Sequence, residues 1–357
     1  EIISSNSKTS YNGNYGLNAS WTLYNGNKRL KTIQQEKLNN QVAELDVATS
    51  ENNIQESIAQ VYIQILYAAE SVKVNESTLQ VSIAQRDRGQ ELLNAGSIAK
   101  SDFAQLEAQV STDRYQLVTA QATLEDYKLQ LKQLLELDGE NEMNIYLPAL
   151  SDENVLAPLP TKKDVYISAL SLRPEIEASK LNVEASELGI GIAKSSYLPT
   201  ISLSAGIGTN HTSGSDFTFG EQVKNGWNNS IGLSVSVPIF NNRQTKSAVQ
   251  KAKLQYETSM LSLLDEQKTL YKTIEGLWLD ANSAQQRYAA ANEKLKSTQI
   301  SYELISEQFN LGMKNTIELL TEKNNLLQAQ QEQLQAKYMA ILNTQLLKFY
   351  QGDQLAL

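Results

Sequence analysis

The sequence Phe309-Asn310-Leu311-Gly312-Met313 has a counterpart earlier in the chain, Leu93-Asn94-Ala95-Gly96-Ser97, at a fixed offset (312 − 96 = 216). Each stretch separates two long segments that contain no proline. A glycine at such a place suits the end of a helix, where the chain commonly takes a left-handed residue. The sequence therefore predicts two helical hairpins of one design, with Gly96 and Gly312 at their turns.

The same offset relates positions along most of the chain. A period this long indicates two copies of one large unit, because solenoid repeats are roughly 20 to 50 residues long. We therefore expect a two-fold internal repeat in which a strand is followed by two very long helices. The matching positions include Gly16 with Gly232, Tyr24 with Phe240, Lys37-Leu38 with Lys253-Leu254, Glu91 with Glu307, and Leu131-Lys132 with Leu347-Lys348.

The predicted helices are too long for an ordinary globular domain. All six prolines fall between residues 148 and 238, so a helix over Asn241–Phe309 would run uninterrupted for about 100 Å at about 1.5 Å per residue. Its counterpart covers Asn25–Leu93. Apolar residues at coiled-coil spacing predict a packing seam on each helix of the second hairpin. The first seam is Leu254, Leu261, Leu264, Tyr271, Ile274, Trp278 and Ala281, and the second is Leu320, Leu327, Leu334, Tyr338 and Ile341.

Three segments alternate apolar with small polar residues, namely Leu17–Leu23, Ile201–Gly208 and Ile231–Ile239. This period of two predicts strands with one apolar face, and each run is near the roughly 9 to 11 residues that cross a bilayer. A half-buried strand of a soluble sandwich has the same pattern. Aromatic residues near the strand ends favour a membrane girdle, and residues 209–228 are expected to form a long polar loop. The expected girdle is Tyr15, Trp21, Tyr24, Tyr197, Trp227 and Phe240.

Three or four strands cannot close a barrel alone, so we expect an oligomer. Composition limits the chemistry further. The chain has no cysteine, one histidine and a net charge of −9, which excludes disulfides and argues against imidazole metal sites and against nucleic acid as a partner. No stretch of the sequence is apolar for long enough to form a transmembrane helix. We expect no enzyme activity, no cofactor and no metal.

These features together resemble the TolC-like outer membrane efflux protein family. The most specific are the internal repeat, the Tyr197–Leu203 segment entering a strand, Arg173-Pro174-Glu175-Ile176 opening the preceding helix, and the turn pattern Phe309-x-x-Gly312-x-Lys314-x-x-x-Glu318. The resemblance implies a homotrimer in the outer membrane of a Gram-negative bacterium, in contact with its lipid. Each protomer would give four strands to one twelve-stranded barrel and long helices to an α-helical tunnel across the periplasm.

The resemblance also implies a function. The trimer would be a passive exit duct for efflux or type I secretion, docked to a periplasmic adaptor protein and an inner membrane transporter, and gated at its periplasmic tip. Gly96 and Gly312 would form the tip turns that contact the adaptor. Carried over position by position, the tip gate would be Ser101, Asp102, Phe309, Lys314 and Glu318.

Two hypotheses concern the charged tip residues. Asp102 and Glu318 occupy equivalent positions, so a trimer would carry six carboxylates in one narrow ring, which would attract cations and raise some of their pKa values. Alternatively, both acids lie near helix N-termini, where the helix dipole alone explains them. We further expect Asp102 to pair with Lys314 and help hold the tip shut.

The expected organisation has six parts. The counterpart of residues 173–208 is expected to precede Glu1 and to be missing from this sequence. The six parts are a barrel strand of the first repeat (1–24), its helical hairpin (25–137), an equatorial crossover (138–172), a helix of the second repeat (173–198), its β-hairpin (199–240) and its helical hairpin with the C-terminus (241–357).

The sequence also leaves an alternative function open, namely a soluble coiled-coil scaffold or periplasmic adaptor.

Overall fold

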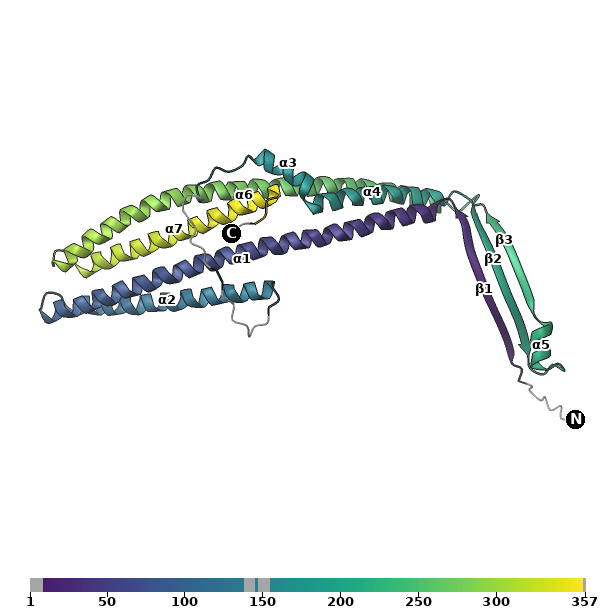
Figure 1. The fold of residues 1–357 in the computed structure, drawn as a ribbon, viewed down its shortest axis with the longest axis horizontal. Coiled ribbons are helices and arrows are strands. Elements are labelled where there is room, and N and C mark those ends of the chain that lie inside the picture. The colour runs from purple at the N-terminus through teal and green to yellow at the C-terminus, as the bar shows by residue number, and fades with distance from the viewer. Residues whose placement is uncertain (1–8, 138–144, 147–154, 356–357) are drawn as a thin grey trace. The chain divides into compact units, whose positions relative to one another are not determined.

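The computed structural model describes residues 9–137, 145–146 and 155–355 (Figure 1). The chain is mainly α-helical with one small sheet, and it divides into two compact units. The first unit comprises Glu1–Glu44 and Glu177–Leu264, and the second comprises Leu45–Ile176 and Asp265–Leu357. In chain order the elements are β1 (Asn12–Asn25), α1 (Lys28–Asn94), α2 (Lys100–Leu134), α3 (Lys162–Leu172), α4 (Pro174–Ser195), β2 (Thr200–Thr212), α5 (Phe219–Asn225), β3 (Asn228–Ser236), α6 (Gln244–Asn310) and α7 (Thr316–Gln351).

The first unit contains an antiparallel sheet with the strand order β1-β2-β3. Its register places apolar residues beside apolar residues, as in the row Trp21, Leu203 and Leu233. The adjacent row is Ser20, Ser204 and Gly232. One face of the sheet is therefore apolar and the other carries small polar side chains, which confirms the alternation predicted from the sequence.

Two expectations about the strands were wrong. β3 ends at Ser236, two residues before Pro238, because proline has no N–H to donate to a sheet. The region 209–228 is not a simple polar loop, since β2 runs to Thr212 and α5 follows. α5 begins with a capping box, in which Thr218 Oγ1 accepts from Glu221 N at 3.4 Å and Glu221 Oε2 accepts from Thr218 N at 2.9 Å. The T-x-x-E pattern that encodes it was visible in the sequence.

Helix α4 packs closely on the start of α1 within the first unit. Gln35 Nε2 donates to the Ala185 carbonyl at 2.7 Å, and Lys31 Nζ donates to the Gly191 carbonyl at 3.4 Å. A Cβ on Gly191 would lie 2.9 Å from that Nζ. Gly189-Ile190-Gly191 lies within α4, and the absence of a side chain at Gly191 leaves room for that of Lys31.

Two helical hairpins, α1–α2 and α6–α7, have their turns and most of their length in the second unit (Figure 1). At their turns Gly96 and Gly312 have φ values of +73° and +75°, so the predicted left-handed conformation is confirmed. Ser97 N donates to Leu92 O and Met313 N donates to Gln308 O, both at 2.8 Å. These six-to-one bonds are those of a Schellman motif, which satisfies carbonyl groups at a helix end.

The core of the second unit forms two clusters. One joins α1, α6 and α7 around the fully buried Tyr288, and the other joins α3, the start of α4, α6 and α7 around Ile274. α3 lies within the expected crossover 138–172, of which residues 138–144 and 147–154 lie outside the described residues. Trp278 Nε1 donates to the Pro160 carbonyl at 3.0 Å and so fixes the segment before α3.

The predicted seams are only partly buried. On α6, Ile274 and Ala281 are buried in the second unit, whereas Leu254 and Leu261 are exposed in the first. On α7, Leu320, Leu327 and Leu334 are half-buried, and the buried stripe lies on neighbouring positions. That stripe is Thr316, Leu319, Lys323, Leu326 and Ala329. The seam prediction missed it because a threonine and a lysine occupy two of its positions.

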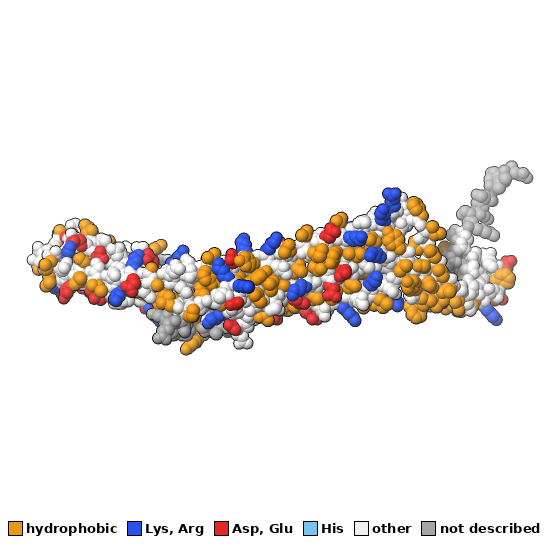
Figure 2. Space-filling model, turned by 90° about the horizontal axis from the view of Figure 1, so that it is seen from above, with side chains coloured by type: hydrophobic (Ala, Val, Ile, Leu, Met, Phe, Trp, Pro, Cys, Tyr) orange, Lys and Arg blue, Asp and Glu red, His pale blue; other side chains and the backbone are white. Residues whose placement is uncertain are grey.

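Charged side chains of both signs are interspersed on the face shown in Figure 2. In that view the described residues form no stripe of a single charge. None of the described helices is long and apolar enough to cross a membrane.

Alanine at Gly312 tests the left-handed turn directly. Because an L-residue is strained at φ +75°, Gly312→Ala should lower the free energy of unfolding by about 1 kcal/mol. Gly276 is the matched control, since it lies inside α6 and a Cβ added there would meet only open space. Gly276→Ala should raise the free energy of unfolding by about 0.5–1 kcal/mol. Chemical denaturation in detergent, followed by circular dichroism, measures both, and equal effects of the two variants would contradict the assignment.

Candidate functional site

The turn between α6 and α7 holds the acidic residue Glu318 by three contacts. Asn315 caps α7, with its Oδ1 accepting from Glu318 N at 2.9 Å, while Glu318 Oε2 accepts from Asn315 N at 3.2 Å. Lys314 Nζ lies 2.6 Å from Glu318 Oε1. The hydrogen bond from Lys314, followed by that from the Asn315 N–H, lowers the pKa of Glu318. Within one chain, the carboxylate is therefore stabilised in its charged form.

The turn between α1 and α2 is a weaker version of the same arrangement. Asp102 Oδ2 accepts from the backbone N–H of Ala99 at 3.2 Å, but Ala99 has no side-chain oxygen to return the bond. Ser101 is exposed in the first turn of α2. Both acids are thus engaged at helix N-termini, as one of the two sequence hypotheses held.

The expected pair between Asp102 and Lys314 is not formed within the single chain, and a pair between copies stays a prediction. Lys314 pairs with Glu318, four residues along its own turn, because that partner is reached without ordering a second segment. Among the residues that the structure describes, Asp102 forms no ion pair. Phe309 is buried beside the turn, so it packs in the interior there.

The apolar face of the sheet is exposed in the single chain. Leu17, Leu233 and Ile231 are 73%, 65% and 84% exposed. In water such a face would be costly, since each fully buried aliphatic side chain is worth about 1.5–3 kcal/mol relative to exposure. The face therefore requires an apolar environment or a partner.

The aromatic residues expected to form a girdle stand at both ends of the sheet. Tyr15 and Trp227 lie at the α5 end, where Tyr15 contacts Phe219 edge-on with a centroid distance of 6.3 Å. Trp21 and Tyr24 lie toward the other end of β1. At that end of the sheet, Tyr197 precedes β2 and Phe240 follows β3 in the sequence. From Tyr15 to Tyr24 a strand rises about 30 Å at about 3.3 Å per residue. Tilted by about 40°, that length matches an apolar band about 25 Å tall.

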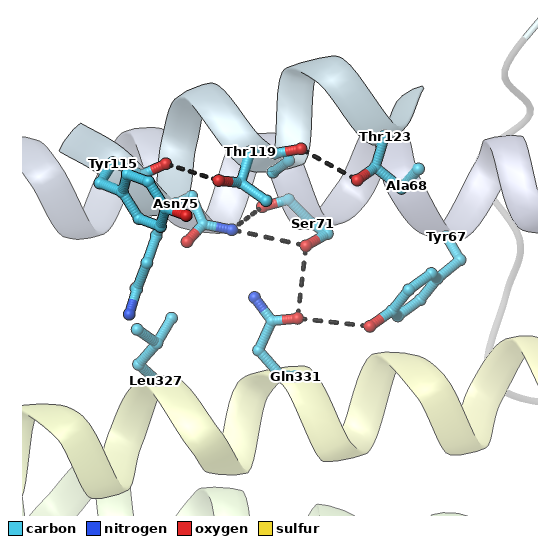
Figure 3. Close-up of a pocket in the computed structure, with 11 residues that line it drawn as sticks. Tyr67, Ala68, Ser71, Asn75, Tyr115, Thr119, Thr123, Leu327 and Gln331 are labelled. Atoms are coloured by element: carbon cyan, nitrogen blue, oxygen red, sulfur yellow. Dashed lines mark hydrogen bonds between the residues drawn. The ribbon is translucent and has the colours of Figure 1, made fainter. Parts of the chain in front are cut away.

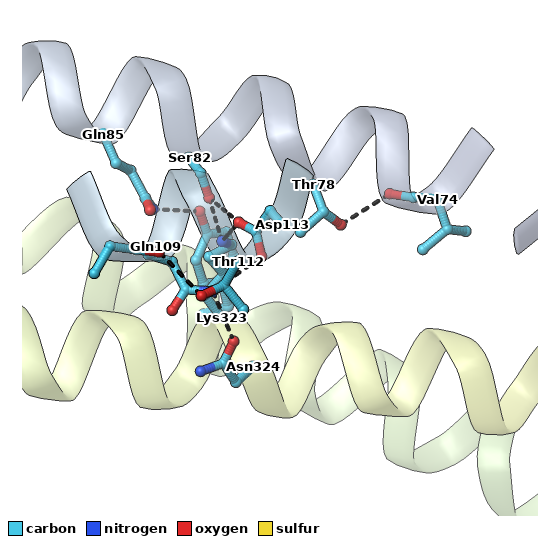
Figure 4. A network of polar contacts seen from close by, with 11 residues as sticks. Val74, Thr78, Ser82, Gln85, Gln109, Thr112, Asp113, Lys323 and Asn324 are labelled. Carbon is cyan, nitrogen blue, oxygen red and sulfur yellow. Dashed lines mark hydrogen bonds and ion pairs between the residues drawn. The ribbon is translucent and has the colours of Figure 1, made fainter. Parts of the chain in front are cut away.

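Sequence reasoning missed a buried charged cluster that joins the two hairpins (Figure 4). Lys323 of α7 donates from Nζ to Asp113 Oδ2 of α2 and to Ser82 Oγ of α1, and Ser82 also donates to Asp113. The three side chains are 3%, 1% and 2% exposed. Burial lowers the pKa of Lys323, and Asp113 opposes that shift. Gln109 Nε2 donates to the second carboxylate oxygen of Asp113 at 2.9 Å.

The Lys323–Asp113–Ser82 cluster has a structural role and not a catalytic one. A serine beside a lysine is the arrangement of some nucleophilic enzymes, but no substrate can reach side chains buried to this degree. A buried ion pair adds little net stability compared with apolar residues, whereas removing one partner costs about 3–5 kcal/mol. The signal that could have revealed it is positional, since Lys323 shares the stripe of Leu319 and Leu326 on α7.

A second polar layer lies beside a pocket of about 410 Å³ lined by α1, α2 and α7 (Figure 3). Gln331 Oε1 accepts from Tyr67 OH at 3.4 Å and from Ser71 Oγ at 3.3 Å. Asn75 Nδ2 donates to the Ser71 carbonyl at 2.8 Å. The labelled lining side chains are neutral, and the described residues contain no group of three or more His, Cys, Asp and Glu side chains that could hold a metal ion.

The Arg173-Pro174-Glu175-Ile176 motif also has a structural explanation. Arg173 is buried, and its guanidinium lies 2.8 Å from Glu175, 3.3 Å from Glu56 of α1 and 4.2 Å from the ring centroid of Tyr350 of α7. Burial, together with Glu56, raises the pKa of Tyr350 to about 12. The motif thus fastens α1 and α7 to the junction of α3 and α4.

Comparison with known proteins identifies the family. The family model described as outer membrane efflux protein matches residues 3–136 and 165–352. The chain belongs to the outer membrane efflux protein family. Its location is therefore the outer membrane, and the exposed apolar face of its sheet has an apolar environment available.

Individual relatives are distant in sequence. The chain is 24% identical over 294 residues to the outer membrane efflux protein BepC of Brucella suis biovar 1, a match that covers 82% of this chain and 61% of BepC. It is 23% identical over 311 residues to the outer membrane protein TolC of Escherichia coli K12, covering 85% of this chain and 62% of TolC. The chain thus spans about three-fifths of the length of these curated relatives.

Solved structures share the fold. A crystal structure of CusC superposes with a TM-score of 0.83 at 19% identity, covering 99% of this chain and 80% of CusC. The outer membrane protein VceC of Vibrio cholerae superposes with a TM-score of 0.78 at 15% identity, covering 98% of this chain and 88% of VceC.

The contact of the sheet with lipid can be tested by tryptophan fluorescence, because the three tryptophans occupy different environments. Trp21 is exposed on the apolar face of the sheet, whereas Trp278 is hydrogen-bonded in the second unit. A Trp227→Phe/Trp278→Phe variant retains only Trp21, and brominated lipids should quench its emission strongly. The matched Trp21→Phe/Trp227→Phe variant retains Trp278 and should stay unquenched. Equal quenching of both variants would show that the apolar face of the sheet is no more exposed to lipid than the region around Trp278.

Proposed function

We propose that this chain forms a passive exit duct through the outer membrane as a homotrimer. Each complete protomer would contribute four strands to a twelve-stranded barrel, and its long helices would form a coiled-coil barrel in the periplasm. One observation carries the proposal. The sheet has an exposed apolar face, and among the described strands β1 and β3 each have one unpaired edge. In lipid, such edges are satisfied only by closing the sheet with other copies.

The proposal includes a two-fold internal repeat. α1 and α6 begin at Lys28 and Gln244 and end at Asn94 and Asn310, so both pairs of boundaries keep the offset of the two turn glycines (244 − 28 = 310 − 94 = 216). The starts of β1 and β3 keep it as well (228 − 12 = 216). A trimer of such chains would carry six similar helical hairpins, which can close a tunnel with pseudo-sixfold symmetry. On this division, residues 1–24 and 199–240 belong to the barrel, and 25–137 and 241–357 belong to the hairpins.

The names of relatives support an export function. They include the alkaline protease secretion protein AprF of Pseudomonas aeruginosa and the antibiotic efflux pump outer membrane protein ArpC of Pseudomonas putida. We propose that the duct works with a periplasmic adaptor and an inner membrane transporter, which would supply the energy and select the cargo. The Gly96 and Gly312 turns would meet the adaptor, since a Cβ added at either glycine would meet only open space in the single chain.

The tip would be gated by its charged residues. Asp102 and Glu318 of three protomers would place six carboxylates near one end of the tunnel, and Lys314 would hold Glu318 in its charged form. Ser101 and the buried Phe309 would support this ring from the adjoining turns. A ring of carboxylates attracts cations, so the closed end would select for them.

The alternative function is a soluble coiled-coil scaffold or periplasmic adaptor. Membership in an outer membrane family and the exposed apolar face of the sheet favour the duct. Dependence on detergent separates the two, because a scaffold stays soluble without it.

Single-channel recording tests the duct. The protein extracted from outer membranes and reconstituted in a planar bilayer should give discrete, long-lived conductance steps. A Leu17→Asp/Leu233→Asp variant places two charges on the exposed apolar face and should insert less well, because a charge on the lipid-facing side of a barrel is destabilising. A Ser20→Asp/Ser234→Asp variant on the opposite face of the same sheet, at positions that are not paired with each other, is the control and should insert. An unmodified protein that stays soluble without detergent and gives no steps would reject the duct.

The pH dependence of ion selectivity tests the carboxylate ring. Lys314 lowers the pKa of Glu318, so the carboxylate should stay charged, and the duct cation-selective, to a lower pH than an unpaired glutamate allows. In Lys314→Met the pKa of Glu318 should return toward its ordinary value, so selectivity should be lost at a higher pH as the medium is acidified. Reversal potentials in a salt gradient measure this.

Lys294→Met is the control for that experiment. It also removes a lysine from an exposed pair, with Glu332, but away from the turns. The midpoint of the pH curve should not move in this variant. The ring would be excluded if Lys314→Met left the midpoint unchanged or moved it to lower pH.

A further inference from the structure

The polar contacts between the two hairpins are stacked in a few layers. Gln331 of α7 contacts α1 in one layer, through Tyr67 and Ser71 (Figure 3). Lys323 contacts α1 and α2 in the next layer, nearer the turns (Figure 4). Close to it, Gln109 Nε2 lies 3.4 Å from Asn324 Oδ1, and Gln85 Nε2 donates to Tyr302 OH at 2.9 Å.

Beyond these layers, toward the turns, the described side chains make polar contacts only within their own hairpin. In residues 86–108 the contacts include the ion pair of Arg88 with Glu91 at 2.6 Å. In residues 303–322 they include the pair of Lys314 with Glu318. The two turns are therefore not tied to each other by polar contacts of the described residues, and the last charged tie between the hairpins is the Lys323 cluster.

All three members of the cluster stand at core positions of coiled-coil type. Lys323 follows Leu319 by four residues and precedes Leu326 by three on the buried stripe of α7. Asp113 follows Val110 by three residues on α2, and Ser82 follows Leu79 by three on α1. A polar group at a core position fixes the axial register of a coiled coil, because every shifted register sets it against apolar neighbours.

We propose that the Lys323–Asp113–Ser82 cluster is a fixed fulcrum, which holds the two hairpins in one register and confines opening movements to the helix segments between it and the turns. This inference rests on the gated duct proposed above. It names the regulation of that gate, namely the place where movement stops.

The energetics of the contacts support a fulcrum here. Sliding one hairpin past the other would separate Lys323 from Asp113 and leave two buried charges without partners, a state that proteins avoid. Movement nearer the turns breaks no contact of this kind, since the Lys314–Glu318 pair is partly exposed and belongs to a single hairpin. The segments beyond the cluster are thus the ones free to move apart.

Distances between spin labels test the fulcrum. The chain has no cysteine, so introduced cysteines are the only labelled sites. Asn94→Cys/Asn310→Cys reports on the turn side of the cluster, and Glu76→Cys/Gln328→Cys reports on the other side, with Glu76 and Asn310 among the exposed positions. Glu318→Ala loosens one turn by removing its cap contact and its ion pair. In that background the first distance should shift or broaden, whereas the second should keep its native distribution.

Variants of the cluster itself complete the test. Lys323→Met should broaden the second distance and lower the apparent melting temperature by on the order of 5–15 °C, because it leaves Asp113 buried and unpaired. Lys323→Met/Asp113→Leu should regain the melting temperature but keep the broadened distance, since register is no longer fixed. The exchanged pair Lys323→Asp/Asp113→Lys should narrow the distance again. The control Lys294→Met removes an exposed pair and should change neither distance.

Three results would overturn the fulcrum. They are a second distance that changes together with the first in the Glu318→Ala background, a first distance that does not change there, and a narrow second distance in the stable double variant. These outcomes are independent of conductance. A missing conductance step with the expected distances rejects the duct alone, and a conducting protein with the wrong distances rejects the fulcrum alone.

Discussion

The constraint on which the structure depends is the pairing of backbone groups at the edges of its sheet. Among the strands that the structure describes, β1 and β3 each have one unpaired edge, and the apolar face of the sheet is exposed. Within a bilayer each unsatisfied N–H or carbonyl group costs several kcal/mol, so open edges do not persist there. Three or four strands cannot close a barrel alone, so in the proposed duct the free edges would be paired with strands of other copies. Oligomerisation would then be what allows this sheet to stand in the outer membrane.

The long helical hairpins are under a different constraint. They face water over much of their length, and their axial register must still be fixed. Apolar clusters around Tyr288 and Ile274 supply packing in the second unit, but apolar packing alone permits sliding along a coiled coil. Isolated polar layers supply the register. The Lys323 cluster contributes specificity more than stability, since buried ion pairs gain little over well-packed apolar residues.

Much of this fold was predictable from residue spacing. The repeat, the absence of proline from both hairpins and the alternation of Leu17–Leu23 indicated the helices, turns and strand faces, because these are local properties of the chain. Helix α5 was not predicted, because its capping box at Thr218 lies in a segment expected to be a polar loop. Strand β3 was predicted to extend past Pro238, but it ends before that proline. The burial of Lys323 was not predicted, because a lysine on a helix is expected by default to lie on the solvated face. Only the three-dimensional packing shows that Asp113 and Ser82 contact Lys323. Contacts between residues so far apart in the sequence leave no local pattern in it.

The number of copies in the detergent-solubilised protein, measured by native mass spectrometry, tests whether the strand edges are paired between chains. The proposed homotrimer predicts a complex of three chains that survives gentle removal of detergent and falls apart in a Leu17→Asp/Leu233→Asp variant. A stable, folded monomer in detergent would contradict the account, because its sheet edges would then be satisfied without any partner chain.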